Sequence, residues 1–294
     1  MKPEIQFPQR APRLNVELAI GPIDVFDSGG SGPVVVLLHG LLMNASLWST
    51  VVEQLPDGIR IIVPTLPMGA HQLPAHADAD LSLRGLAAAV VELLDKLDLH
   101  DVTLVGNDTG GAIAQLVAAS DTARIGRLVL VSCEAFDNLP PGLTGRAIVL
   151  TGRLPAPLFG LVMQQLRLRP LRRLPFTFGW LTRFGDTTVR AWLQPLLKER
   201  NIRRDAVRLL RAIPREKAAL AAASEKLADF GRPALVVWAH RDRVMPPAHG
   251  RRLADLLNAP LIEVQDSRTL IPLDQPSVLA EELARFVGSN RAKS

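Results

Sequence analysis

The segment with the clearest chemical character is the tight turn Gly106-Asn107-Asp108-Thr109-Gly110. An apolar run of strand character, 102–105, precedes it, and small residues that open a helix follow it. A side chain on such a strand-to-helix turn stands clear of the sheet, and the start of the helix offers N–H groups and the positive end of its dipole. Aspartate is ionised at neutral pH, so Asp108 can act as a nucleophile without a base to activate it. The alternative is that Asp108 only caps the helix.

A second segment has an apolar run at 34–38 followed by His39 and Gly40. With the turn described above, it resembles the third strand and the His-Gly loop of the α/β-hydrolase superfamily. The resemblance covers about 14–135 and 232–287.

This resemblance implies roles for several backbone and side-chain groups. The N–H groups of Leu41 and Thr109 would form an oxyanion hole, and His39 would be structural rather than catalytic. Most superfamily members have serine where this chain has Asp108. The aspartate is similar to the haloalkane dehalogenase and epoxide hydrolase branch, in which the carboxylate attacks carbon and forms a covalent ester.

The resemblance also implies an acid that orients an imidazole. Asp242 follows the apolar run 234–238, in a stretch that resembles the strand and loop carrying this acid. Glu134 directly follows another apolar run and occupies the other position that dehalogenase relatives use. The closer local pattern favours Asp242, with Glu134 as the alternative acid. A surface ion pair with Arg241 or Arg243 is the non-catalytic interpretation of Asp242.

The catalytic histidine of the superfamily is replaced in this chain. Its position matches Thr269, and no histidine follows His249. A threonine hydroxyl cannot serve as the base for water at neutral pH. The candidates to replace the histidine are His240, which lies two residues before Asp242, and His71, which lies in a loop near the expected mouth of the site.

Other markers of the two named activities are also missing. Leu41 and Thr109 stand where dehalogenase-like chains often place the asparagine and tryptophan that hold halide. The chain has no tyrosine, the residue with which epoxide hydrolases protonate the opening oxygen. Trp180 and Trp192 are candidates for lining a substrate pocket, and the alternative for both is the hydrophobic core.

Strand-like and helical stretches alternate along the chain. The apolar runs with strand character are 14–20, 23–26, 34–38, 61–63, 102–105, 128–131, 235–238 and 261–264. Helical stretches are 83–97, 111–119, 250–257 and 277–287, with Ser82 as the N-cap of the first. Gly21-Pro22 is expected to form a hairpin turn. The alternation predicts an α/β protein with the α/β-hydrolase fold, a mostly parallel twisted sheet flanked by helices.

The βα alternation stops between 138 and 230, where prolines break several short helices. We expect a helical lid at 138–230, inserted into a core formed by 1–137 and 231–294. An insertion at this point would lie over the carboxyl ends of the strands, where α/β proteins bind ligands. We therefore expect Asp108 to be exposed at the carboxyl edge of the sheet, beneath this lid.

Basic charge is concentrated in this insertion. Residues 139–215 carry 15 Lys and Arg against 3 Asp and Glu, whereas the rest of the chain carries 19 against 26. Such asymmetry marks either a surface for nucleic acid, membranes or acidic ligands, or a solvated helical layer. The solvated layer is favoured, because no interleaved aromatic residues indicate nucleic-acid binding.

Composition limits the classes of protein further. With 294 residues and 48% hydrophobic content, the chain can bury a large core. Cys133 is the only cysteine, which excludes an intramolecular disulfide and a cysteine-rich zinc site. The sequence contains no uninterrupted run of about 18 apolar residues, so we expect no membrane-spanning helix. We expect a soluble, cytoplasmic protein without metal, cofactor, nucleic-acid partner or stable membrane insertion; its oligomeric state, a homodimer included, is left open.

These patterns predict a hydrolase that acts on a small, largely apolar substrate through Asp108, at an ester or carbon–halogen bond. The alternative, based on Thr269, is a non-hydrolytic member: a ligand-binding protein or an enzyme that works without a cofactor and without a covalent step.

Overall fold

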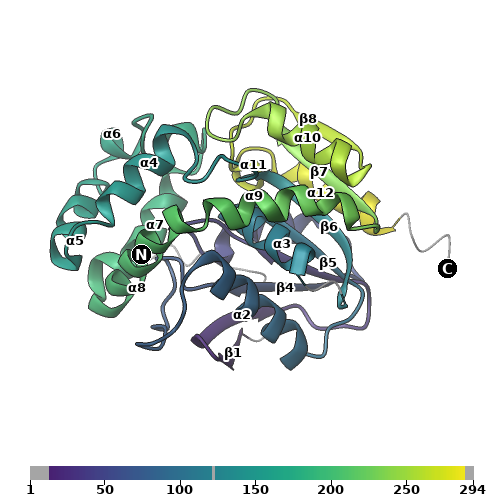
Figure 1. Cartoon of the computed structure of the whole chain (residues 1–294), viewed down its shortest axis with the longest axis horizontal. Helices are drawn as coiled ribbons and strands as arrows, with labels where there is room; N and C mark the ends of the chain where they lie inside the picture. The colour runs from purple at the N-terminus through teal and green to yellow at the C-terminus, as the bar shows by residue number, and fades with distance from the viewer. Residues whose placement is uncertain (1–12, 121–122, 289–294) are drawn as a thin grey trace.

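A computed structural model describes residues 13–120 and 123–288 (Figure 1). Its centre is an eight-stranded sheet in the order β1-β2-β4-β3-β5-β6-β7-β8. The strands are β1 (Arg13–Leu18), β2 (Gly21–Asp27), β3 (Val34–Leu38), β4 (Arg60–Thr65), β5 (Val102–Asp108), β6 (Ile125–Cys133), β7 (Ala234–Ala239) and β8 (Leu261–Val264). The pairs β1–β2 and β2–β4 are antiparallel, and all later neighbours are parallel. The predicted α/β-hydrolase fold is confirmed.

The central strands are apolar along their whole length because both faces of the sheet are covered. Every residue of β5 and of β7 is buried. Parallel strands enclosed in this way lack the alternation of a half-exposed strand. Their carboxyl ends meet at one edge of the sheet, where β5 ends at Asp108 and β6 at Cys133.

Helices flank the sheet. They are α1 (Ser49–Gln54), α2 (Leu83–Lys96), α3 (Thr109–Ser120), α4 (Gly142–Thr151), α5 (Ala156–Gln165), α6 (Arg169–Arg172), α7 (Asp186–Lys198), α8 (Arg200–Ala212), α9 (Lys217–Lys226), α10 (Pro247–Leu257), α11 (Ile271–Asp274) and α12 (Pro276–Gly288). Short 3-10 turns are η1 (Ala45–Trp48), η2 (Phe178–Trp180), η3 (Ile213–Arg215) and η4 (Leu227–Asp229). Ser82 caps α2 as predicted, its hydroxyl accepting the Gly85 N–H at 3.1 Å. None of the helices in the described ranges is long and apolar enough to cross a membrane.

The segment between β6 and β7 contains helices and no strand in the described chain. Its first helices, α4 to α6, gather at one end of the molecule (Figure 1). The last one, α9, packs against α3, so it covers the sheet and does not belong to that group. Trp192 on α7 fastens the insertion to the core, since its indole N–H donates to the Ser46 hydroxyl at 2.8 Å.

The hairpin turn lies two residues earlier than predicted. Leu18 pairs with Gly21, so Ala19 and Ile20 form the turn and Gly21-Pro22 belongs to β2. Gly21 has φ of 113°, a conformation that suits glycine, and it turns the chain into the strand. The Glu92 carboxylate on α2 accepts the Ala19 N–H at 2.9 Å, which fixes the turn at this place. The expectation of a Gly21-Pro22 turn was therefore wrong.

Candidate active site

Asp108 lies at the end of β5, where the chain turns directly into α3. Its backbone has φ of 55°, in the left-handed region that non-glycine residues rarely adopt. The turn is tight because Gly110 lies against β3. A Cβ at Gly110 would come within 2.3 Å of the Leu38 carbonyl oxygen. The sequence Gly-x-Asp-x-Gly thus forces the carboxylate out of the sheet at its carboxyl edge.

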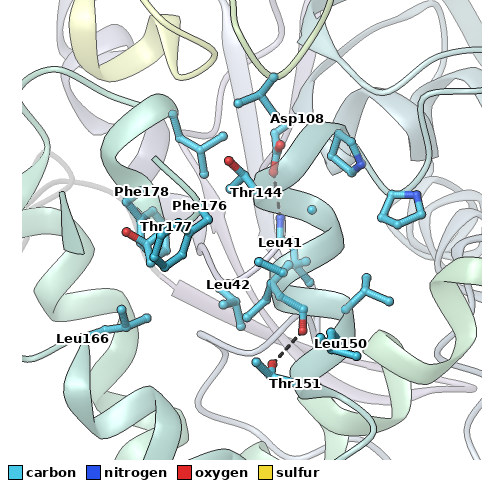
Figure 2. A pocket seen from close by; sticks show the side chains of 18 of the residues that line it. Leu41, Leu42, Asp108, Thr144, Leu150, Thr151, Leu166, Phe176, Thr177 and Phe178 are labelled. Carbon is cyan, nitrogen blue, oxygen red and sulfur yellow. Dashed lines mark hydrogen bonds between the residues drawn. The ribbon is translucent and has the colours of Figure 1, made fainter. Parts of the chain in front are cut away.

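Two backbone amides hold the carboxylate. The Leu41 N–H donates to Asp108 Oδ2 at 3.2 Å (Figure 2). The Thr109 N–H also hydrogen-bonds to the carboxylate. Gly40 makes this approach possible, since a Cβ there would lie 2.1 Å from Oδ2. The amides of Leu41 and Thr109 therefore meet at the side chain of Asp108, in the arrangement that the resemblance implies for an oxyanion hole.

Asp108 is buried, whereas the sequence led us to expect an exposed side chain beneath the lid. It is 5% exposed, because apolar residues of the helical insertion close over it. Burial raises its pKa to about 7, the nearby Asp242 carboxylate adds to the rise, and the hydrogen bonds from Thr109 and Leu41 oppose it. A carboxyl with such a pKa exchanges its proton in the physiological range.

Asp242 faces Thr269, as expected if it is the remnant of an acid–histidine pair. Its Oδ1 accepts the N–H groups of Val244 and Met245 and the Thr269 hydroxyl, all at 2.9 Å. Burial raises the pKa of Asp242 to about 6 against the effect of these hydrogen bonds. Thr269 is completely buried and does not line the cavity beside Asp108. The threonine thus binds one oxygen of the acid and offers no proton acceptor to a substrate, whereas Oδ2 of the acid is buried with no hydrogen-bond partner among the described residues.

Glu134, the alternative acid, lies in the site. Its Oε1 accepts the Thr109 hydroxyl at 2.9 Å, while Oε2 is buried with no hydrogen-bond partner among the described residues. Burial, with the nearby charge of Asp108, raises its pKa well above the usual value. Unlike Asp242, Glu134 lines the same cavity as Asp108.

The histidines singled out in the sequence lie elsewhere. His71 is buried, accepts the Gly69 N–H at 3.1 Å and faces Asp205 at 3.4 Å. His240 pairs with Glu263 at 3.0 Å in a partly exposed position. Neither lines the cavity, nor does any other histidine in the described part of the chain.

His39 has a structural environment, in line with the role that the resemblance implies. Its Nδ1 donates to the Gly40 carbonyl and its Nε2 accepts the Leu66 N–H, both at 2.9 Å. Burial lowers its pKa to about 4, so the imidazole is neutral. His39 thereby fixes the loop that presents the Leu41 amide.

A cavity of about 450 Å³ adjoins Asp108 and Glu134. Its wall is apolar and comes mainly from α4, α5 and the segment 171–181, with Leu41 and Leu42 from the core (Figure 2). Neither Trp180 nor Trp192 is part of this wall: Trp180 stacks under the Arg243 guanidinium and Trp192 binds Ser46. Among the described residues of the wall, the only ionisable groups are the two carboxyls. Within the described ranges no cluster of side chains fits a metal ion.

Asn107 is a residue whose role the sequence did not reveal. Its side-chain NH₂ donates to the carbonyls of Val131 and Thr269, each at 2.8 Å. It therefore ties the turn at Asp108 to β6 and to the loop of Thr269. The only signal in the sequence was a polar residue near the end of a buried strand.

Comparisons with known proteins identify the family and agree with the fold. The model of the alpha/beta hydrolase family matches residues 35–282. A 2-hydroxy-6-oxononadienedioate/2-hydroxy-6-oxononatrienedioate hydrolase of Paraburkholderia xenovorans is 30% identical over 247 residues, which are 79% of each chain. The crystal structure of the haloalkane dehalogenase DbeA from Bradyrhizobium elkani superposes with a TM-score of 0.77 at 19% identity, covering 96% of this chain and 99% of that one.

A further relative is an uncharacterized protein of Mycobacterium tuberculosis, 34% identical over 121 residues. That match covers 41% of this chain and only 35%, about a third, of the mycobacterial protein's length. The family match is much longer and includes β3, the turn at Asp108, the helical insertion and the loop of Thr269. The chain therefore belongs to the alpha/beta hydrolase family.

Proposed function

We propose that the protein is a hydrolase whose Asp108 carboxylate attacks a small, largely apolar substrate at a carbon–halogen or ester bond. The observation that supports this best is the position of Asp108 in the wall of an apolar cavity, with one carboxylate oxygen held by the Leu41 amide. Fixing one oxygen leaves the other available to a substrate in a set orientation, which lowers the entropic cost of attack.

The first step needs no base. For an alkyl halide, Asp108 Oδ1 forms a bond to carbon, and the carbon–halogen bond breaks with its electron pair leaving as halide. The product is an alkyl ester of Asp108. Because few water molecules reach a side chain that is 5% exposed, little solvent has to be removed from the nucleophile.

The second step needs an activated water, and Glu134 is the group that fits this task. Water attacks Cγ of the ester while Glu134 Oε2 takes its proton, and the oxyanion on Oδ2 is stabilised by the amides of Leu41 and Thr109. Collapse expels the alkoxide, which takes the proton from Glu134 and leaves as the alcohol, and Asp108 remains as a neutral acid. Loss of the second water proton from this acid to solvent restores the Asp108 carboxylate. The charge of Asp108 is one of the causes that raise the pKa of Glu134. Esterification of Asp108 removes that charge, so the second step begins with Glu134 in a state that ionises more readily.

The wall of the cavity argues for an uncharged substrate. It contains two carboxyls and no Lys or Arg. The hydrolase of Paraburkholderia xenovorans is named for dioate substrates, which carry two carboxylates. Such a molecule would be repelled in this cavity, so we do not assign that substrate to this chain.

Asp108 should be alkylated by an apolar alkyl halide. Incubation with iodohexane is expected to add one hexyl group per chain, and peptide mapping by mass spectrometry should place it on Asp108. Asp108→Asn should remove the adduct, whereas Asp57→Asn, a change at an exposed carboxylate, should leave it. A label on Cys133 alone, or none, would contradict the proposal.

The rate of adduct formation should rise with pH. With a pKa of about 7, the ionised fraction of Asp108 increases about tenfold between pH 6 and pH 8. The initial rate of alkylation, followed by intact mass, should increase by the same factor and then level off. A rate that is constant over this range would show that the attacking group is already ionised at pH 6 and would contradict the assigned pKa.

Glu134→Gln should separate the two steps. The amide still accepts the Thr109 hydroxyl but cannot take a proton, so the adduct should form normally and its hydrolysis should slow by about a hundredfold. Asp242→Asn is the matched control, because that carboxyl does not line the cavity, and it should slow hydrolysis much less. Equal slowing in both variants would contradict the proposal that Glu134 is the base that takes the proton from water.

A second candidate function follows from Thr269. Its hydroxyl donates to Oδ1 of Asp242, at the position where the resemblance places an imidazole, and it cannot serve as a base for water. If water cannot be activated at all, the protein binds an apolar ligand without turning it over. Saturable binding of an apolar fluorescent probe in the cavity, without any adduct on Asp108 from a panel of halides, epoxides and esters, would favour this function over hydrolysis.

A further inference from the structure

Large apolar side chains are exposed almost exclusively in one part of the molecule. Of the nine such side chains exposed in the described ranges, eight lie between Leu143 and Phe184, and the ninth is Val278. Scattered exposed apolar residues are ordinary, but a concentration of this kind marks a binding surface.

Two helices carry most of this surface. On α5, Leu158, Leu161 and Val162 follow the i, i+3, i+4 spacing and form one exposed face, while Phe159 and Met163 are buried on the other. On α4, Leu143 and Leu150 lie two turns apart on an exposed face. Both helices pack on α8, which covers their inner sides. A helix that is apolar on both faces is expected in contact with a second apolar phase.

This surface is continuous with the cavity. Leu150, Val162 and Phe176 are 59%, 40% and 50% exposed, and all three also line the cavity beside Asp108. Leu150 and Phe176 are labelled in Figure 2. The cavity is therefore lined in part by residues of this exposed apolar surface.

The segment that carries these exposed apolar residues is also positively charged. Residues 138–185 contain seven arginines and no acidic residue. Arg172 is buried and paired with Asp186, whereas the other six are exposed. Of these, Arg146, Arg153, Arg167 and Arg173 form no ion pair within the described chain.

We propose that the face of α4, α5 and α6 docks on an anionic lipid bilayer, with the mouth of the cavity turned towards the lipid. Aliphatic side chains would enter the boundary of the acyl chains while the arginines bind phosphate groups, as in other interfacial helices. A second copy of the chain fits this face poorly, because it would place the same unpaired arginines opposite each other. Nucleic acid would leave the leucines without a partner. On the proposed function, the bilayer would also be the source of the apolar substrate.

Vesicle binding tests this proposal without relying on catalysis. The full chain should co-sediment with vesicles containing a third of phosphatidylglycerol, bind phosphatidylcholine vesicles much less, and be released by high salt. Binding that is equal on both vesicle types, or absent from both, would overturn the proposal.

Surface variants identify the face. Arg146→Gln/Arg167→Gln/Arg173→Gln should weaken binding about a hundredfold, since the loss of each arginine near an anionic surface weakens the attraction about fivefold. Leu158→Gln/Leu161→Gln/Leu168→Gln should weaken it about tenfold or more. The matched controls are Arg251→Gln and Val278→Gln, exposed residues on α10 and α12. Unchanged binding in both triple variants would place the contact elsewhere and overturn the proposal.

Two further measurements separate lipid docking from misfolding of the variants and from self-association. None of the six substituted residues lines the cavity, so alkylation of Asp108 by iodohexane should persist in both triple variants and show that they are folded. If the proposed function fails and no variant is alkylated, thermal unfolding followed by circular dichroism gives the same information. A dimer in solution that the leucine variant dissociates, without vesicle binding by the native chain, would overturn the proposal in favour of self-association.

Discussion

The burial of an ionisable carboxyl beside an apolar cavity is the constraint on which the rest of the site depends. Asp108 is exposed to only 5%, and removal from water raises its pKa to about 7. What keeps the anion accessible is the pair of backbone amides from Leu41 and Thr109. These amides come from two loops that follow neighbouring parallel strands, β3 and β5, so the sheet itself sets their spacing. The neutral His39 holds the loop that presents the Leu41 amide, and the absence of a Cβ at Gly40 lets the Asp108 carboxylate approach that loop.

A second consequence of this enclosure is that three carboxyls lie near one another with no cation among the cavity residues. Asp108 and Glu134 line the same cavity, and the Thr109 hydroxyl donates to Glu134. Because the two carboxyls are close, ionisation of one makes ionisation of the other less favourable. Asp242 is held apart by two backbone amides and the Thr269 hydroxyl. In the family resemblance, a histidine would stand between acid and nucleophile. Here Thr269 stands at the position of that histidine and supplies no base. One oxygen of Asp242 and one of Glu134 have no hydrogen-bond partner among the described residues, but only Glu134 lines the cavity.

Local sequence determines some of these features and not others. The strand, turn and helix around Asp108 could be predicted because a run of apolar residues, a glycine-flanked turn and small residues act within a few positions. The meeting of Leu41 with Asp108 was implied by the resemblance to the α/β-hydrolase superfamily and not by local sequence alone. The exposure of Asp108, the turn at Ala19-Ile20 and the places of Trp180 and Trp192 depend on contacts between distant segments. The sequence alone does not separate the exposed leucines of α4 and α5 from core residues, because both are apolar residues in helices. Only the packing of the folded chain shows that these leucines are exposed.

The most direct test of Asp108 as the nucleophile is the fate of water oxygen in a single turnover. With protein in excess over an alkyl halide in H₂¹⁸O, attack of water on Cγ of the Asp108 ester must leave ¹⁸O in the carboxylate. We expect the peptide containing Asp108 to gain the mass of one ¹⁸O atom, and the alcohol released to carry only the ester oxygen of normal mass. An alcohol labelled with ¹⁸O and an unlabelled Asp108 would mean that water attacks the substrate directly, and would contradict the role of Asp108 as nucleophile.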